Sequence, residues 1–439
     1  ALLLAFQLSA QTFALANEDN GIKVVPVNFT HNGYSYEIEG VAKSTDGDYQ
    51  MKSPARLAAR ELPSTYDPSS SGEITTVKDQ ASTGACWAFS ALACAEQDLI
   101  KKGLENPSAE FSVPALVLSS NSGTATGKDD FSSGGNWLFA ASALANGQGL
   151  CYEDYEPLLE SGTENMIVSE NKKSVSEYRL NYVMELSSTT QVKRKIMELG
   201  AVSASYFAGN GYMNHNNTAY YDPDASKNTI INHSVTVVGW DDNYSKDNFR
   251  YKPANNGAWL VKGSWGADQD NDGFYWVSYD EAEFGQFCCY DFEESCDNTY
   301  HYSKMTGYIV NASNDGSVYG ANVFTAKADE KLDKAGFMYV GKTGSADYTL
   351  SVYTDVSDSD PIGVLETQIS GSVSANGFYT VDFPKDILLE EGEKYSISVK
   401  FSGDSGRGYL LAESDRTSKT QSGQSYISLN GKYWSDVGV

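Results

Sequence analysis

The chain has 439 residues, which is room for two or three domains rather than one. Hydrophobic residues make up 41% of it and charged residues 21%, values typical of a packed globular protein, so wholesale disorder is excluded. The formal net charge of −26 argues against a nucleic-acid partner, because an acidic surface repels a phosphate backbone.

Residues 1–16 are largely apolar and end in Ala14-Leu15-Ala16, ahead of a polar run. A short apolar stretch that stops at a small-x-small site is typical of a secretory signal peptide, here without its basic start. We therefore predict a truncated signal peptide over 1–16, with an N-terminal core helix as the alternative. No later stretch is long and apolar enough to span a bilayer, so we expect no membrane span.

The chain continues with a polar segment, and a predicted helix follows it. Residues 17–60 are polar and contain two short strand-like runs, at 22–27 and 34–38. A helix is predicted from Cys86 through Ile100, because Lys101-Lys102-Gly103 forms a typical helix C-terminus of basic residues followed by glycine.

From about residue 190 the pattern becomes β-rich. A helix-like run covers Val192 to Leu199, and strand-like runs follow at 201–207, 233–240, 258–262 and 273–279. A helical first half and a β-rich second half predict an α+β domain of two lobes over 61–296.

Beyond residue 297 the sequence is typical of an all-β domain. Apolar and polar residues alternate in several short runs, which indicates half-buried strands. Asn430-Gly431 between two apolar runs predicts a two-residue hairpin turn. We therefore predict a β-sandwich or jelly roll over 297–439, and we expect its last strand to lie beyond Val439.

Cys86 is the most informative residue of the chain. A glycine-containing turn delivers it to the first turn of the predicted helix, where unpaired backbone N–H groups and the helix dipole favour a thiolate. A thiolate is a nucleophile, so this placement suits covalent catalysis. The alternative, a small buried hydrophobic residue, is weakened by Gln80 upstream and Trp87 directly after.

A thiolate needs a base, and the chain has only four His. His233 opens a predicted strand, where an imidazole beside a helix N-terminus forms a thiolate–imidazolium pair. A single strand histidine is more often structural. Paired with Cys86, 147 residues upstream, the catalytic interpretation is favoured.

These residues carry a resemblance to the papain family of cysteine peptidases, over Leu62 to about Tyr279. The matching motifs are Gln80, Gly84-Ala85-Cys86-Trp87, Gly134-Gly135, His233 and the block 257–266, which contains Ser264-Trp265-Gly266. The resemblance implies a two-lobed fold and peptide-bond hydrolysis.

The resemblance also implies a role for each matching residue. Cys86 is the nucleophile, His233 is the base and later the acid, and the Gln80 amide joins the Cys86 N–H in an oxyanion hole. For the substrate, the implied binding residues are Gly134 and Gly135 along an extended backbone, Ile231 in an apolar specificity pocket and Trp265 as a shield against water.

Two positions depart from the family pattern. Thr83 stands where the family usually has a cysteine, so the corresponding disulfide is absent. Gly263 stands where the family has the asparagine that orients the imidazole, so we expect slowed chemistry and predict that Gly263→Asn raises kcat/KM. A water, a backbone carbonyl or the amide of Asn232, Asn255 or Asn256 is the alternative orienting group.

Three further expectations concern the rest of the protease part. Residues 17–60 are placed like a propeptide, with cleavage near Arg60, and an ordinary extension is the alternative. Among Cys288, Cys289 and Cys296 a local disulfide is favoured over metal ligation, whereas Cys94 and Cys151 are expected to be buried thiols, with pairing as the alternative. No cofactor or metal is predicted, although 268–273 resembles the start of a structural calcium loop.

The all-β part resembles the lectin-like domain that follows such peptidases in some Gram-positive surface proteins. The run Tyr319 to Ala326 carries this likeness, which implies binding of cell-surface glycan or cell wall, with a structural spacer as the alternative. The sequence thus favours a secreted or cell-surface cysteine endopeptidase that acts on proteins or peptides. The alternative is a protein inactivated at Gly263 that serves in adhesion or glycan binding.

Overall fold

A computed structural model describes residues 61–437, with gaps at 70, 121–130, 132–133, 148–149, 156–176, 210, 226–230, 268–269, 303–305, 313–316, 342–343, 358–359, 404–408 and 414–420. Ahead of residue 61 it describes four strands: β1 (Phe6–Gln7), β2 (Ile22–Val24), β3 (Val27–His31) and β4 (Tyr34–Ile38). Apart from these strands, the predicted signal peptide, the propeptide-like segment and the cleavage point at Arg60 lie outside the described residues.

The helical lobe contains three helices, α2 (Cys86–Lys101), α3 (Val113–Ser120) and α4 (Trp137–Ala145), with a short 3-10 turn η1 (Glu153–Tyr155). Helix α2 begins and ends as the sequence predicts, since Gly103 follows its last turn with φ +71° and donates its N–H to Ile100 O at 2.9 Å. Fourteen of its residues are buried, which makes it the central element of this lobe.

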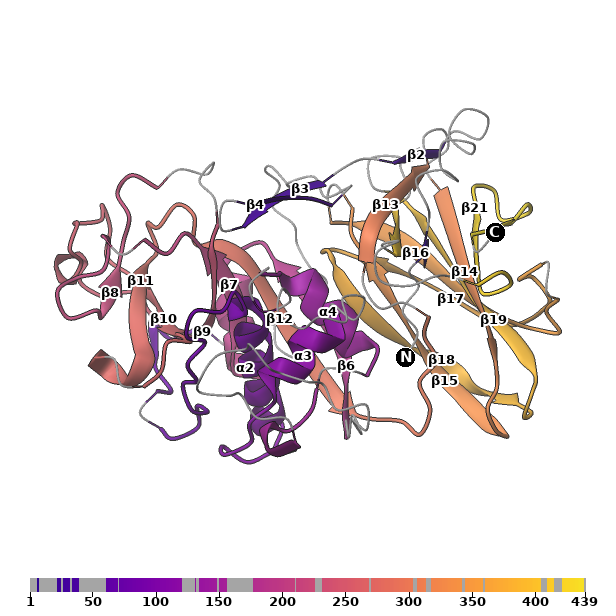
Figure 1. Cartoon of the computed structure of the whole chain (residues 1–439), viewed down its shortest axis with the longest axis horizontal. Coiled ribbons are helices and arrows are strands. Elements are labelled where there is room, and N and C mark those ends of the chain that lie inside the picture. The colour runs from indigo at the N-terminus through magenta and orange to yellow at the C-terminus, as the bar shows by residue number, and fades with distance from the viewer. Residues whose placement is uncertain are drawn as a thin grey trace.

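A ten-stranded sheet forms the second lobe (Figure 1). Its strands from residues 61–296 are β5 (Thr65–Tyr66), β6 (Tyr178–Leu186), β7 (Val202–Tyr206), β8 (Ala219–Tyr220), β9 (His233–Asp241), β10 (Ala258–Lys262), β11 (Phe274–Ser278) and β12 (Gly285–Glu294). Helix α5 (Thr189–Leu199) packs on it, and the short turns are η3 (Lys246–Asn248) and η4 (Asp270–Gly273). These elements match the predicted helix and strands, and they confirm the two-lobed α+β fold.

The C-terminal part is a sandwich, as predicted. A six-stranded sheet has the order β17-β16-β19-β14-β21-β22, and β15 packs across from it, with the Phe337 and Phe401 ring centroids 5.3 Å apart. The elements are β13 (Thr306–Ala312), β14 (Ser317–Thr325), β15 (Glu330–Tyr339), β16 (Ala346–Thr354), β17 (Val364–Val373), β18 (Gly377–Leu389), β19 (Lys394–Ser402), β20 (Tyr409–Glu413), β21 (Ser425–Ser428) and β22 (Ser435–Asp436). Strands β13 and β20 pair with each other and with β2 and β1.

The two parts share one sheet, which the sequence does not predict. Strand β18 pairs with β6 through Gly377 to Tyr379, so that β15 and β18 extend the protease sheet. A Cβ at Gly377 would lie 2.0 Å from Val183 O, so only glycine permits this approach of the two backbones. The sandwich is therefore fixed to the protease part by backbone pairing.

The predicted two-residue turn at Asn430-Gly431 is wrong in its length. Strands β21 and β22 do pair as a hairpin, but residues 429–434 connect them. The Asn430 side chain accepts from the N–H groups of Lys432 and Tyr433, at 2.9 and 3.0 Å, and draws them into the turn. Of the two turn residues, only Gly431 has a positive φ, so the tight hairpin turn cannot form.

The six cysteines all lie in the described part of the chain and are free thiols. The predicted local disulfide is therefore wrong. Cys288 and Cys289 are successive residues of β12, which point to opposite faces of the sheet, and each is fully buried. Cys94 and Cys151 are buried thiols, as expected.

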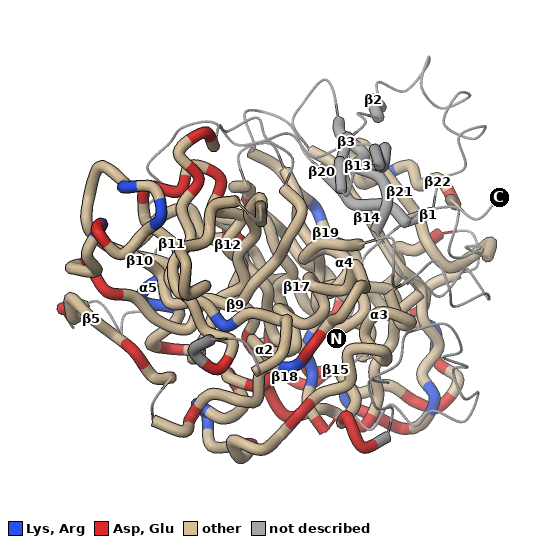
Figure 2. Tube along the Cα trace, turned by 60° about the vertical axis from the view of Figure 1, so that its left-hand side comes forward, with Lys and Arg blue, Asp and Glu red and all other residues tan. Residues whose placement is uncertain are grey.

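Charge is spread over many loops of the molecule rather than gathered on one face (Figure 2). Among the described residues, no helix is long and apolar enough to cross a membrane.

Candidate active site

Cys86 is the first residue of α2, and Ala85 is the N-cap without a side-chain hydrogen bond. The turn before it is fixed by the Gly84 N–H, which donates to Phe131 O at 2.6 Å. The Cys86 side chain is only 2% exposed. The structure therefore places the predicted nucleophile at the helix terminus that the sequence indicates.

Burial raises the pKa of the Cys86 thiol above its ordinary value. Hydrogen bonding by the backbone of Ser234 and of Trp87, and by the Ser234 hydroxyl, opposes this rise without cancelling it. The helix N-terminus does not by itself make Cys86 a thiolate in this structure. A cationic partner is needed, and the residue next to Ser234 is His233.

His233 opens β9, as predicted, and is 4% exposed. Its ring is stacked on that of Trp265, with centroids 4.3 Å apart and planes at 7°. The Tyr206 ring lies edge-on to it, with centroids 5.9 Å apart. Since Trp265 is 39% exposed, it covers the imidazole on the solvent side.

Gln80 joins the loop of Cys86 to the loop of Trp265. Its N–H donates to Ser264 O at 2.7 Å, and the Ser264 hydroxyl donates to its Oε1 at 2.6 Å. Its Nε2 donates to Thr83 O at 2.8 Å. Because the amide NH2 group has two protons, this bond leaves one donor for a substrate oxygen.

The Gly134-Gly135 segment packs against the indole of Trp87, the residue after Cys86. A Cβ at Gly135 would lie 2.4 Å from Trp87 Cε2, and Gly134 has φ +72°, so both positions require glycine. Ile231 is half-buried two residues before β9. The structure thus brings Gly135 against Trp87, the residue after Cys86, and the substrate-binding roles of Gly134, Gly135 and Ile231 stay predictions.

Gly263 directly follows β10, and its N–H donates to Gly273 O at 3.0 Å. The three amides considered as substitutes for the missing asparagine are engaged elsewhere. Asn232 bonds with the Ala208 N–H and C=O at 2.7 and 3.3 Å. Asn255 bonds with Asp280, and Asn256 accepts from the Lys246 N–H, both on the surface.

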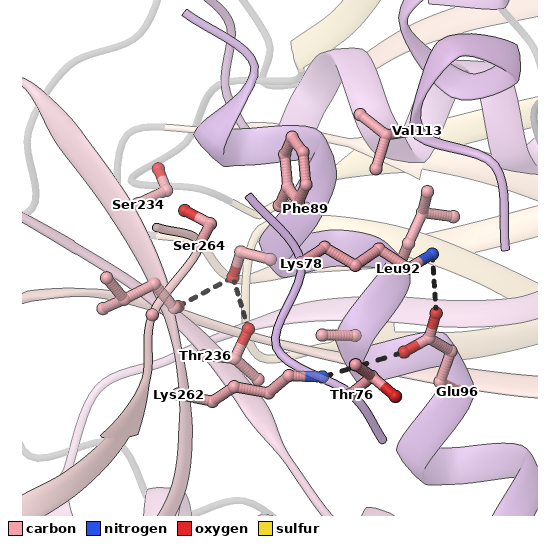
Figure 3. Close-up of a pocket in the computed structure, with 14 residues that line it drawn as sticks. Thr76, Lys78, Phe89, Leu92, Glu96, Val113, Ser234, Thr236, Lys262 and Ser264 are labelled. Carbon is pink, nitrogen blue, oxygen red and sulfur yellow. Dashed lines mark hydrogen bonds and ion pairs between the residues drawn. The ribbon is translucent and has the colours of Figure 1, made fainter. Parts of the chain in front are cut away.

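A buried charge cluster behind Cys86 was not predicted from the sequence. Lys78 and Lys262 lie 3.6 and 3.9 Å from the two carboxylate oxygens of Glu96 (Figure 3). Glu96 also accepts from the Thr75 hydroxyl at 2.6 Å. Burial lowers the pKa of Lys262, and Glu96 opposes this shift.

This cluster ties α2 to the β lobe. Glu96 belongs to α2, Lys262 to β10, and Lys78 to the segment that precedes α2. The signal that could have found it is a charged residue on an apolar helix face, as Glu96 is between Leu92 and Leu99, and another at the end of an apolar run, as Lys262 is after residues 258–261.

The structure adds nothing to support a metal site. Among the described residues, no group of three His, Cys, Asp or Glu is arranged to hold a metal ion. The calcium-like loop at 268–273 lies partly outside the described residues, and its last part is the turn η4.

Comparisons with known proteins agree with this geometry. The family "Papain family cysteine protease" matches residues 62–314, and "Lectin like domain" matches residues 299–439. Procathepsin L of Felis catus is 28% identical over 224 residues, and cathepsin L2 of Homo sapiens is 25% identical over 225. Each match covers 50% of this chain and 62% of the relative's length.

Two solved structures share both parts. The protease and lectin-like domains of Cwp84, a surface layer associated protein of Clostridium difficile, match 99% of this chain and 93% of that one, with 25% identity and a TM-score of 0.73. A clostridial Cwp84 structure after propeptide cleavage matches 85% of this chain and 94% of that one, with 27% identity and a TM-score of 0.72. The chain therefore belongs to the papain family of cysteine proteases, and a lectin-like domain follows its protease domain.

Proposed function

We propose that the protein is a cysteine endopeptidase that uses a thiolate–imidazolium pair of Cys86 and His233. The observation that carries this proposal is the position of Cys86 at the start of α2, in hydrogen-bonding contact with Ser234, which adjoins His233. Burial disfavours an isolated thiolate there, so proton transfer to the neighbouring imidazole provides the charge partner.

In the proposed mechanism the thiolate attacks the carbonyl carbon of the scissile peptide bond. A C–S bond forms, and the carbonyl electron pair moves to oxygen, where the Cys86 N–H and Gln80 Nε2 hold the oxyanion. His233 gives its proton to the departing amine, and an acyl-enzyme remains. His233 then takes a proton from water, which attacks the thioester and releases the acid and the thiolate.

The protease domain in this proposal covers 61–296, and the lectin-like domain covers 297–439. Residues 1–16 act as a secretion signal and 17–60 as a propeptide, so the protein is secreted or surface-bound as a zymogen. Two observations support this: the similar Cwp84 is described as surface layer associated, and one of its structures follows propeptide cleavage. Substrates are proteins or peptides, and no cofactor takes part.

Labelling of the nucleophile tests the proposal. The full chain is treated with an epoxide peptide inhibitor, and mass spectrometry locates the adduct. We expect stoichiometric labelling of Cys86 and loss of peptide hydrolysis in parallel, with neither in Cys86→Ala. Hydrolysis that persists in Cys86→Ala would refute the assignment.

Self-processing tests the zymogen part. The wild-type chain is incubated with a thiol beside Cys86→Ala, and the new N-terminus is sequenced. We expect trimming near Arg60 in the wild type alone. An intact Asn17 on fully active protein would contradict the propeptide role.

Gly263 favours a second candidate function, that of a surface adhesion or glycan-binding protein with an inactive protease domain. A glycan array tests it with full-length Cys86→Ala, because β18 pairs with β6 and the lectin-like domain shares a sheet with the protease domain. Glycan binding by a wild-type chain that neither labels nor hydrolyses would favour this second function.

A further inference from the structure

The space beside Gly263 is filled by a tyrosine. A Cβ at Gly263 would lie 3.3 Å from Tyr275 Cε1 and 3.2 Å from Gly273 O. Both contacts are tighter than an ordinary van der Waals contact. A side chain at 263 would therefore need Tyr275 or the Gly273 carbonyl to move by a few tenths of an ångström.

Tyr275 is hydrogen-bonded to Tyr206, and the Tyr206 ring packs against the His233 imidazole. The Tyr206 and Tyr275 hydroxyl oxygens lie 2.8 Å apart, and the two side chains are 1% and 4% exposed. Tyr206 is the direct register partner of His233 between β7 and β9, and its ring packs edge-on against the imidazole.

The imidazole is thus held on two sides by rings. Trp265 stacks on its face with ring centroids 4.3 Å apart, and Tyr206 meets it edge-on at 5.9 Å, which is within the range of favourable edge-to-face aromatic pairs. The stacked indole also attracts a cation, which suits an imidazolium. Since Trp265 is partly exposed, the hydrogen-bonded tyrosine pair forms the rigid side of this support.

Resting on the proposed function, we propose that Tyr206 and Tyr275 are positioning residues that hold the His233 imidazole in place of the asparagine amide that Gly263 lacks. The hydroxyl pair fixes the Tyr206 ring, and the ring fixes the imidazole. Burial raises the pKa of both phenols, so they remain neutral through the working pH range.

The proposal changes the expectation for Gly263→Asn. Introduced alone, the asparagine meets Tyr275, and we expect no gain in kcat/KM. In the double variant with Tyr275→Ile, the asparagine has the space that the phenol ring occupied. We expect this asparagine to restore the orientation of the His233 imidazole that Tyr275→Ile alone removes.

The test compares Tyr206→Phe, Tyr275→Phe, Tyr275→Ile and Gly263→Asn/Tyr275→Ile in the full chain. One readout is kcat and KM on a peptide, and the other is the pH profile of Cys86 alkylation by iodoacetamide. We expect each Phe variant to lower kcat about tenfold with KM little changed, and to shift the acid limb of the alkylation profile. The double variant should recover at least half of the kcat that Tyr275→Ile loses.

Tyr395→Phe is the matched control, because Tyr395 is a fully buried tyrosine of the lectin-like domain. It should leave both readouts unchanged. Phe variants that keep wild-type kcat and an unshifted profile, or a double variant no better than Tyr275→Ile, would overturn the proposal. Alkylation reports the thiolate–imidazolium pair without any turnover. If the alkylation profile of the Phe variants shifts from that of the wild type as expected, but the wild type hydrolyses no peptide, the proposed function is refuted and the positioning roles stand.

Discussion

The protease and lectin-like domains differ in where they place their charges. Where α2 meets β10 in the protease domain, the Glu96 and Lys262 side chains are 3% and 5% exposed, although they carry charge. In the lectin-like domain, the Lys331–Asp386 pair is 65% and 53% exposed, and the interior is filled by apolar and aromatic side chains such as Phe337 and Phe401. The protease domain thus keeps a charged cluster in its interior, whereas this pair of the lectin-like domain lies in water.

Buried charges are stabilising only while each keeps its partner. Removal of one partner leaves an uncompensated charge in a medium where desolvation is expensive. An exposed pair loses little, because water solvates whichever partner remains. The two domains should therefore respond very differently to the same kind of substitution.

Glu96→Gln should have the largest effect. It keeps the shape of the side chain but leaves Lys262 without its buried counter-charge, so we expect a loss of about 3–5 kcal/mol in the free energy of unfolding. Asp386→Asn is the matched control, with an expected loss below about 1 kcal/mol. Urea unfolding followed by tryptophan fluorescence measures both, and equal losses in the two variants would contradict the comparison.

Local sequence patterns predict the elements and the reactive residues well. The helix from Cys86 and the strand from His233 each depend on neighbours close in sequence. Tyr206 could not be found this way, because its partnership with His233 depends on the register of two strands that meet only in the folded chain. Glu96 could have been found, since a charge inside an apolar helix face requires a partner.

The junction of the two domains shows the same limit. Apolar alternation indicates an all-β domain beyond residue 297, but it does not say that β18 leaves the sandwich to pair with β6. That choice depends on the steric fit at Gly377, where no side chain separates the backbones. Long-range pairing of this kind is set by shape rather than by periodicity.

Gly377→Ala should have the second largest effect. The added methyl group would lie 2.0 Å from Val183 O, so β18 and β6 must separate, and we expect a loss of about 1–3 kcal/mol. Gly211→Ala is the control, because a Cβ there meets nothing within 4 Å and the backbone has no positive φ. Limited proteolysis between the domains should accelerate in Gly377→Ala only, and equal cleavage rates would show that the junction tolerates the methyl group.

The last prediction concerns Asp98→Asn, whose effect is seen in how the free energy of unfolding depends on pH. Asp98 of α2 and Asp291 of β12 share one ammonium, Lys102, at 2.8 Å each. Burial raises the pKa of Asp98 to about 7, and the nearby Asp291 adds to the rise against the attraction of Lys102. The folded state therefore binds a proton on Asp98 at pH values where the unfolded chain has released it.

The sign of the pH effect follows from this difference in bound protons. Between about pH 4 and 7 the folded state binds more protons than the unfolded state, so the free energy of unfolding falls as pH rises, by at most about 1.4 kcal/mol per pH unit for one group. Asp98→Asn removes this titration, and Lys102 keeps Asp291 as its partner. The stability of the wild type relative to Asp98→Asn should thus decline from pH 5 to 7, whereas Asp386→Asn at the surface should leave the slope unchanged. A wild-type advantage that grows toward pH 7 would mean that Lys102 holds Asp98 ionised, and that the buried acid of α2 stabilises the fold as an ion pair.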